Sequence, residues 1–261
     1  MTPTLKADLE NGRLAATIAD IAEAAGALTL KWWRSSPDVI WKADSSPVTE
    51  ADRAAEILIL EALEQNWPGI ITVAEEQAER DGKPASVPET FWLIDPLDGT
   101  RGFVKGGENY TVNIALIHRG EPVAGVVSAP ALRRTWQSAG VGRGAFVRDW
   151  GGEWSPIRVR ARPELAQAVV SHSLSPAEAD ALVARFGCGG WLASDSSIKF
   201  CLVAEGRCDL YPRDGSINEW DTAAGQAVLE AAGGHVTTLD GARLTYGKPG
   251  LVNPGFLATG A

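Results

Sequence analysis

The chain has 261 residues, of which 45% are hydrophobic and 22% are charged, and its formal net charge is −9 at pH 7. This composition predicts a folded protein with one large core or two coupled smaller cores, and it argues against disorder. The acidic charge argues against a broad interface with nucleic-acid phosphates, which would need clustered Lys and Arg. Carboxylates gathered in one cleft would repel one another, so such a cleft would need a metal cation.

Targeting and redox features are few. No apolar run approaches the ~20 residues of a membrane-spanning helix, and Met1 to Glu10 lack the order of a secretory signal. We therefore expect a soluble cytoplasmic protein, with peripheral association with the inner membrane left open. The three cysteines form no Cys-x-x-Cys pair and are expected to be free thiols in packing positions. The three histidines lack the paired helical spacing of a zinc hydrolase, so zinc is not expected.

The first half of the chain begins with two predicted helices. Apolar residues recur at steps of three and four from Leu14 to Leu28, which predicts an amphipathic helix. A second helix is expected from Thr49 to about Asn66, with Ala55, Leu58 and Ala62 on its inner face. Apolar segments then predict the strands of a sheet at Ile70 to Ala74, Phe91 to Ile94, Val112 to His118, Val123 to Ser128, Thr135 to Ser138 and Gly144 to Arg148.

A boundary is predicted near residue 150, because Asp149 to Arg162 is interrupted by Gly and Pro and has little periodicity. The expected halves are residues 1–150 and 151–261. Helices alternating with strands in both halves predict layered α/β structure. The expected elements of the second half are strands at Val169-Val170 and Cys208 to Tyr211, and helices at Pro176 to Phe186, Ile198 to Glu205 and Thr222 to Ala232.

The strongest motif runs from Trp92 to Arg101 and reads W-L-I-D-P-L-D-G-T-R. An apolar strand is expected to end at Asp95, and Asp98-Gly99-Thr100 should form a tight loop that leads into a helix. Two carboxylates at one strand end suit Mg²⁺, and the N–H groups that follow the glycine suit a phosphate oxygen. Asp-Gly alone is more often an ordinary turn, but the longer pattern favours the metal interpretation.

Other candidate residues each have an ordinary structural explanation. The pair Glu75-Glu76 could be a solvated strand edge. Thr49 and Asp52 could form a capping box, and Asp221 could be the N-cap of a helix. Hydroxyl and cationic groups for a second anion are offered by Ser196, Ser197, Lys199 and Arg213, although single Lys and Arg residues usually lie at the surface.

Together these segments resemble the inositol monophosphatase superfamily. S-P-V-T-x-A-D, the acidic pair, W-L-I-D-P-L-D-G-T and E-W-D-T-A-A-G occur in the order of that family, from about Asp44 to the C-terminus. Ser196 to Arg213 and Asn253-Pro-Gly-Phe256 are most similar to the bacterial 3'(2'),5'-bisphosphate nucleotidases of the CysQ type. The resemblance implies a sugar-phosphatase-like α-β-α-β-α sandwich of two coupled halves, α+β and then α/β, with the site between them.

The resemblance also implies roles for individual residues. Two or three Mg²⁺ ions would be held by Glu75, Asp95, Asp98, Asp221 and the backbone carbonyl of Leu97. The attacking water would be activated by Asp52, Glu75 and Thr100. The substrate would contact Gly99, Thr100, Ser196, Ser197, Lys199, Arg213 and Asp221.

The implied activity is hydrolysis of the 3'-phosphate of 3'-phosphoadenosine 5'-phosphate to AMP and phosphate, a step connected with sulfur assimilation. The implied partner is this small phosphorylated substrate rather than a nucleic-acid polymer. Two alternatives stay open: a phosphatase of inositol or another sugar monophosphate, and a catalytically silent metal or nucleotide sensor. The chain departs from the pattern of close relatives at Gly102, Leu174 and Asp195, and the last two positions lie near the expected nucleotide subsite.

Overall fold

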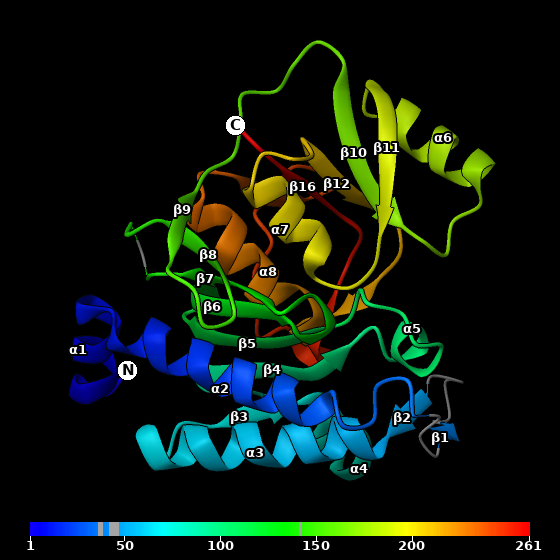
Figure 1. Ribbon diagram of the computed structural model, residues 1–261. Coiled ribbons are helices and arrows are strands. Elements are labelled where there is room, and N and C mark those ends of the chain that lie inside the picture. Colours follow the sequence, from blue (N-terminus) through cyan, green and yellow to red (C-terminus); the bar gives the residue numbers. More distant parts are fainter. Residues whose placement is uncertain (36–38, 42–46, 141) are drawn as a thin grey trace.

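The computed structural model describes residues 1–35, 39–41, 47–140 and 142–261, which form five layers in the order α-β-α-β-α (Figure 1). The predicted layered sandwich is therefore confirmed. Asp44 and Ser46, where the family resemblance begins, lie outside the described residues.

A seven-stranded sheet forms the first β layer, with its strands in sequence order from β3 to β9. The pair β3–β4 is parallel, and every later neighbouring pair in this sheet is antiparallel. Its strands are β3 (Thr72–Ala74), β4 (Thr90–Asp98), β5 (Thr111–His118), β6 (Glu121–Ala129), β7 (Arg134–Ser138), β8 (Ala145–Asp149) and β9 (Ser155–Ile157).

Helices from both halves cover this sheet. On one face α2 and α3 pack against β4, β5 and β6, and on the other face lie α7 and α8 (Figure 1). The longer helices are α1 (Pro3–Asn11), α2 (Arg13–Thr29), α3 (Glu50–Asn66), α6 (Pro176–Ala184) and α8 (Trp220–Ala231). The shorter ones are α4 (Glu75–Asp81), α5 (Thr100–Val104) and α7 (Ile198–Ala204), with single 3₁₀ turns at Pro130–Leu132 and Pro249–Leu251.

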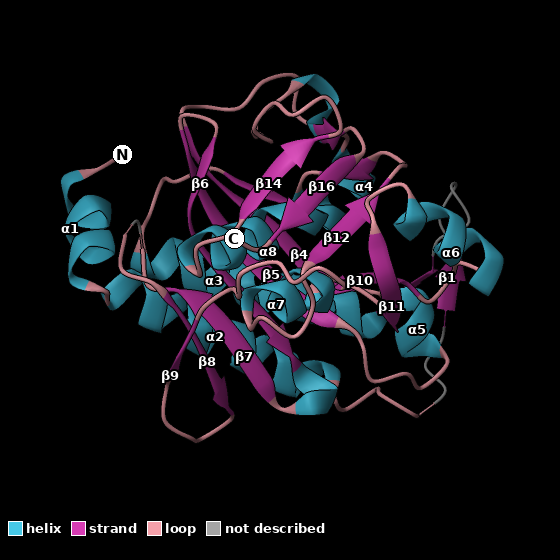
Figure 2. Ribbon diagram, turned by 90° about the horizontal axis from the view of Figure 1, so that it is seen from above, coloured by secondary structure: helices cyan, strands magenta, loops and turns pink. Residues whose placement is uncertain are grey.

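A five-stranded sheet forms the second β layer in the order β11-β10-β12-β16-β14, which can be followed from right to left in Figure 2. α7 and α8 pack on one face of this sheet, and α6 packs against β11. The strands are β10 (Ala166–Ser171), β11 (Cys188–Ser194), β12 (Leu210–Arg213), β14 (His235–Thr238) and β16 (Phe256–Thr259). Two small antiparallel pairs join β1 (Val39–Trp41) to β2 (Pro47–Thr49) and β13 (Ile217–Asn218) to β15 (Val252–Asn253).

The core-facing side of α3 is wider than the predicted one. Ala55 is buried as expected, but Leu58 and Ala62 are only partly buried, and Ile59 and Leu63 take the inner positions at steps of four. The same face also buries Asp52 and Glu56. The predicted residues do pack against the core, but the prediction missed the most buried stripe, because a search for apolar residues passes over these two buried carboxylates.

The two halves share a core rather than meeting at residue 150. β9 lies beyond that residue and still pairs with β8, so the first sheet continues to Ile157. α8 belongs to the second half and packs on β5 and β6 of the first. At that contact a Cβ on Gly125 would lie 2.7 Å from the Ala227 Cβ, so only glycine allows this approach. We propose that the division between the halves lies between β9 and β10.

The described part of the chain contains no helix that is long and apolar enough to cross a membrane. The three cysteines are free; Cys201 and Cys208 are buried, and Cys188 is partly buried.

Candidate metal centre

The carboxylate motif lies at the end of β4, close to the parallel strand β3. Pairing between β4 and β5 is interrupted after Asp95 and resumes at Asp98, so the strand bulges over Pro96 instead of ending at Asp95 as predicted. The backbone N–H of Leu97 donates to Asp95 Oδ1 at 3.0 Å. The bulge thus presents Asp95 and Asp98 at the same edge of the sheet.

Gly99 ends this bulge and begins α5. Its φ is +96°, in the left-handed region that favours glycine, and an added Cβ would lie 3.2 Å from the backbone oxygen of Asn109. The residue directly after it, Thr100, is the first of α5. The tight loop into a helix is therefore present as predicted.

Three carboxylates meet at this edge: ligand oxygens of Glu75, Asp95 and Asp221 all lie within 4.8 Å of one another. Glu75 follows β3, and because Ala74 pairs with Ile94, parallel pairing places Glu75 beside Asp95. Asp221 comes from the first turn of α8, where it accepts from the Asn218 N–H at 3.2 Å. It is not the N-cap, a position that Glu219 occupies.

Asp98 lies beside this group and is held by donors from both halves. The N–H of Ser197 donates to Asp98 Oδ2 at 2.7 Å, and Asn113 Nδ2 donates to the same oxygen at 3.3 Å. Ser197 Oγ in turn donates to the backbone oxygen of Asp221 at 2.9 Å and accepts from Asn113 Nδ2 at 3.0 Å. Ser197 therefore links β4, β5 and α8.

Burial and mutual repulsion raise the pKa values of these carboxyl groups. Burial, followed by the charges of neighbouring carboxylates, raises the pKa of Asp95 and of Asp221 well above the usual range. Burial also raises the pKa of Asp98, although the positive charge of Lys199 opposes the rise. A divalent cation would relieve this repulsion, and oxygen-only donors are the set that Mg²⁺ prefers. The residues present thus fit a Mg²⁺ site.

Asp52 and Thr100 lie next to these carboxylates. Thr100 Oγ1 is 3.2 Å from Asp52 Oδ1 and 3.0 Å from the backbone oxygen of Leu97. Its single proton therefore has two acceptors. Burial, partly offset by hydrogen bonds from Thr49, raises the pKa of Asp52 to about 6, and Glu75 contributes to the rise.

The expected substrate-side residues differ in what their polar groups contact. Ser196 Oγ and Arg213 Nε are buried and make no hydrogen bond among the described residues. Lys199 Nζ donates to the backbone oxygen of Ser196 at 2.7 Å and lies over the ring of Tyr211. The hydroxyl of Ser197, as described above, is engaged within the protein. Free polar atoms for a ligand thus come from Ser196 and Arg213.

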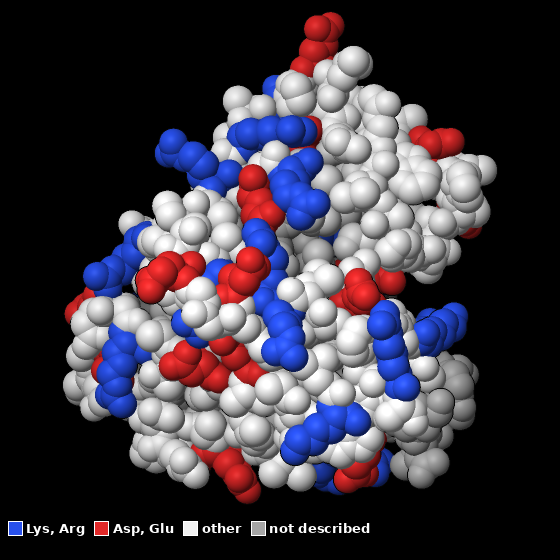
Figure 3. Space-filling model, viewed as in Figure 1, with Lys and Arg blue, Asp and Glu red and all other residues white. Residues whose placement is uncertain are grey.

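The molecule is hollowed between its two halves. Figure 3 shows an indentation at the right, between the part that carries α6 and β11 and the part that carries α5, with acidic atoms at its inner end.

Asp195, one of the departures from the close-relative pattern, precedes Ser196, and its Oδ2 lies 3.1 Å from Nδ1 of His172. Asp195 also accepts from the His172 N–H at 3.3 Å, so it contacts the segment that carries Leu174, the other departure from the close-relative pattern near this subsite.

Sequence reasoning missed Asn113 and Glu56. Asn113 interrupts the apolar run of β5, and Glu56 lies one turn after Asp52 on the buried face of α3. A polar residue in the middle of an apolar strand or helix stripe was the available signal in both cases. Their partners are distant in sequence, so the role of each required the structure.

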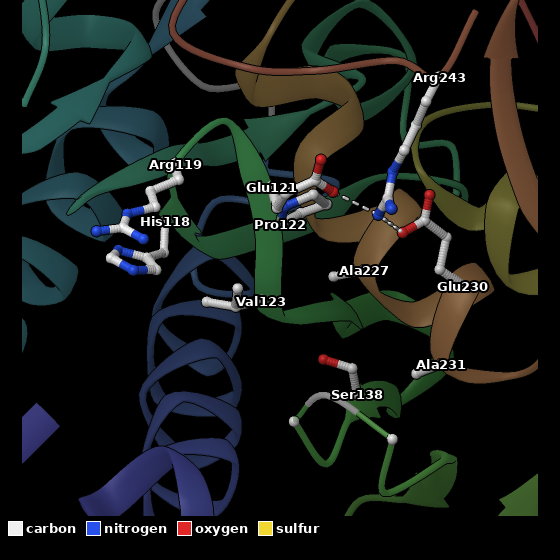
Figure 4. A pocket seen from close by; sticks show the side chains of 12 residues that line it. His118, Arg119, Glu121, Pro122, Val123, Ser138, Ala227, Glu230, Ala231 and Arg243 are labelled. Carbon is white, nitrogen blue, oxygen red and sulfur yellow. Dashed lines mark hydrogen bonds and ion pairs between the residues drawn. The ribbon is translucent and has the colours of Figure 1, made fainter. Parts of the chain in front are cut away.

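A second hollow lies away from this centre. It has a volume of about 530 Å³ and is lined by the β5–β6 turn, the end of β7 and α8 (Figure 4). His118 of this turn pairs with Thr90, at the other end of β4 from Asp98. Figure 4 shows Arg243 paired with both Glu121 and Glu230. None of its lining residues is a predicted site residue.

Comparisons with known proteins agree with the geometry. Residues 11–259 match the inositol monophosphatase family. The 3'(2'),5'-bisphosphate nucleotidase CysQ of Escherichia coli is 43% identical over 221 residues, which cover 84% of this chain and 87% of that protein. The histidinol-phosphatase of Mycobacterium tuberculosis is 37% identical over 222 residues, 83% of each chain.

A solved structure gives the same result for the fold. CysQ from Bacteroides thetaiotaomicron, described as a bacterial member of the inositol monophosphatase family, superposes with a TM-score of 0.77 at 33% sequence identity. The match covers 96% of this chain and 97% of that one. The sequence motifs, the five-layered fold and these matches lead to one conclusion: the chain belongs to the inositol monophosphatase family.

Proposed function

We propose that the protein is a Mg²⁺-dependent phosphomonoesterase that hydrolyses the 3'-phosphate of 3'-phosphoadenosine 5'-phosphate, giving AMP and phosphate. The observation that carries the proposal is the group of carboxylates Glu75, Asp95 and Asp221, whose ligand oxygens lie within 4.8 Å of one another at the edge of the first sheet. The substrate class is supported by CysQ relatives that are 43% identical over most of the chain.

We also propose that the protein is cytoplasmic, a location that its three free thiols support.

The carboxylates of Glu75, Asp95, Asp98 and Asp221, with the carbonyl of Leu97, would hold two or three Mg²⁺ ions. Bound there, Mg²⁺ would neutralise the phosphate charge and lower the pKa of the attacking water. The lone pairs of Thr100 Oγ1 would accept a hydrogen bond from that water while the Thr100 proton is donated to Asp52 Oδ1, 3.2 Å away. Asp52 and Thr100 thus orient the water and receive its proton.

The phosphate would be held by the chain that enters α5. The N–H groups of Gly99 and Thr100 stand where a helix begins, and first-turn N–H groups lack partners inside their helix. These groups would donate to phosphate oxygens as negative charge shifts toward them. Hydrolysis breaks the bond between phosphorus and the 3'-oxygen, and the departing oxygen takes up a proton.

The second phosphate of the nucleotide needs donors outside the carboxylate group. Arg213 Nε and Ser196 Oγ are buried and have no hydrogen-bond partner among the described residues. Burying a polar atom without a partner costs free energy, and a bound ligand could supply the missing hydrogen bonds. Arg213 also lies near enough to Asp221 for its charge to lower the pKa of that carboxyl. Lys199, also buried, adds a second positive charge on this side. These residues support a bisphosphorylated substrate over a monophosphate.

The substrate is tested by comparing kcat/KM for 3'-phosphoadenosine 5'-phosphate, inositol 1-phosphate, fructose 1,6-bisphosphate and histidinol phosphate at saturating Mg²⁺. We expect the nucleotide to be preferred and EDTA to abolish turnover. Preference for inositol 1-phosphate or histidinol phosphate would contradict the nucleotidase assignment. Absence of phosphate release from all four would favour the catalytically silent sensor.

Arg213→Ala and Lys199→Ala test the second-phosphate subsite. Each is expected to weaken kcat/KM for the nucleotide by about 1.5–3 kcal/mol, the usual size of a charged hydrogen bond, and to leave inositol 1-phosphate hydrolysis nearly unchanged. Arg207→Ala, which removes an exposed guanidinium from a neighbouring position, is the matched control. Equal losses for both substrates would mean that these cations act on the carboxylate group itself.

A further inference from the structure

A buried carboxylate outside the ligand group lies one helical turn after Asp52. Glu56 is 4% exposed on α3, and the N–H of Glu76 donates to its Oε2 at 2.8 Å. The N–H of Gln77 also donates to this carboxylate. Glu56 therefore receives two consecutive backbone N–H groups from α4.

These two N–H groups belong to the first turn of α4, which has no cap of its own. The N-cap position is Ala74, whose side chain cannot accept a hydrogen bond. First-turn N–H groups have no partners inside a helix and need an acceptor when they are buried. Glu56 supplies that acceptor from a different helix, so the start of α4 is attached to α3.

The attachment bears directly on a ligand. Glu75 is the first residue of α4, adjacent to Glu76, whose N–H Glu56 binds. α3 also carries Asp52, the partner of Thr100. Among the described residues Glu56 makes no ion pair; the charge of Arg80 lowers the pKa of the Glu56 carboxyl, but Arg80 itself pairs with Asp81. Burial of Glu56 is therefore costly, and the backbone hydrogen bonds from α4 are its main compensation.

We propose that Glu56 is a positioning residue for the metal centre: it binds the N-terminus of α4 and thereby sets the Glu75 carboxylate relative to Asp52 and Asp95. The inference rests on the proposed metal-dependent function, but it concerns metal binding and not the choice of substrate. Its test therefore uses a readout that needs no substrate.

The experiment measures Mn²⁺ binding by isothermal titration calorimetry and by electron paramagnetic resonance on wild type, Glu56→Ala, Glu56→Gln and Glu61→Ala. Outer-shell changes typically cost about 10–100-fold in metal affinity, so Glu56→Ala is expected to weaken Mn²⁺ binding by about that factor. Glu56→Gln keeps an acceptor oxygen and should retain most of the affinity. Glu61→Ala removes an exposed carboxylate from the same helix and should bind Mn²⁺ as wild type does.

A second readout locates the effect. Amide hydrogen exchange should quicken at Glu76 and Gln77 in Glu56→Ala more than elsewhere in the protein, and Glu56→Gln should restore protection. Wild-type Mn²⁺ affinity in a folded Glu56→Ala protein would overturn the proposal, and so would equal losses in Glu56→Ala and Glu56→Gln. Should Glu56→Ala not fold, Glu56→Met replaces it, because Met fills similar volume without an acceptor. If neither variant folds, Glu56 is required for folding itself and the positioning role is rejected.

Discussion

At the residue scale, Asp52 divides two tasks between its two carboxylate oxygens. Oδ2 accepts from the N–H and the hydroxyl of Thr49 at 2.8 and 2.7 Å, which closes the capping box of α3. Oδ1 is left for Thr100. Asp52 therefore caps α3 and contacts Thr100 at the same time. The capping box holds Oδ2 of Asp52 at Thr49, and this leaves Oδ1 directed toward Thr100.

Thr100→Ala tests the part that the hydroxyl plays. It should lower kcat by about 10²–10⁴-fold, the usual contribution of a positioned proton acceptor, and leave the Mn²⁺ dissociation constant nearly unchanged. Thr100→Ser keeps the hydroxyl and should retain most of the turnover. Parallel losses of kcat and metal affinity would instead indicate that Thr100 supports the bulge through Leu97.

At the element scale, the contact between α7 and α8 brings Ser197 and Asp221 together. Phe200 of α7 packs against Tyr211 and Phe256, with ring centroids 5.1 and 5.5 Å away. On the opposite side, a Cβ added at Gly225 of α8 would lie 2.3 Å from Phe200 Cδ2 and 2.9 Å from Phe200 Cβ. The helices are thus in contact through a glycine, with no room for a methyl group.

Gly225→Ala should therefore destabilise the protein, although alanine is the better helix former by about 1 kcal/mol. Overpacking of a rigid core typically costs about 1–3 kcal/mol, and we expect the free energy of unfolding in urea to fall within that range. Gly190→Ala on β11, where an added Cβ would meet no atom within 4 Å, is the control and should change stability by less than about 0.5 kcal/mol. Wild-type stability of Gly225→Ala would show that α7 and α8 separate easily.

At the scale of the whole molecule, the candidate metal centre takes its carboxylates from both halves. Glu75, Asp95 and Asp98 come from the first sheet and its connections, whereas Asp221 comes from α8 and is linked to Asp98 through Ser197. Without cations, these partly or fully buried acids repel one another and oppose folding when they are charged. Metal and protons therefore compete to stabilise the same region.

The pH dependence of stability follows from the direction of these pKa shifts. Folding raises the pKa of Asp52 from 3.8 to about 6 and that of Glu56 from 4.5 to about 7, in both cases chiefly by burial. The folded state binds more protons, so stability is fully present below the unfolded values and is lost as pH rises through the folded ones. The melting temperature of EDTA-treated protein should fall between about pH 5 and about pH 7.5.

Mg²⁺ should reverse that loss and stabilise the protein more at the higher pH, where protons no longer compete with it. Differential scanning calorimetry at both pH values, with and without Mg²⁺, measures the effect. The double variant Asp52→Asn, Glu56→Gln should show a flatter pH dependence without metal. A melting temperature that rises with pH in the EDTA-treated wild type would contradict the claim that burial raises the pKa values of Asp52 and Glu56.

Most of the longer elements and the identity of the motif residues were predictable from the sequence, because they rest on local patterns, whereas α1, α4, β9, β14 and β16 were not predicted. Apolar periodicity located α2 and α3, and the run ending in Asp95 located β4. β11 was missed because its Gly189-Gly190 pair lacks strand propensity, and the extent of β4 was misjudged because a bulge depends on pairing with β5. Local sequence carries no information about such pairing.

Only the tertiary structure decided which contacts position the carboxylates of the candidate metal centre. From the sequence, Glu75-Glu76 could have been a solvated edge and Ser197 a substrate contact. Parallel pairing of β3 with β4 places Glu75 beside Asp95, and the packing of α7 engages the Ser197 hydroxyl within the protein. Glu56 had no visible role until α4 was found against α3. Each of these outcomes depends on contacts between segments distant in the chain, so residue types and spacing determine the chemistry that is available, and long-range packing determines which groups can perform it.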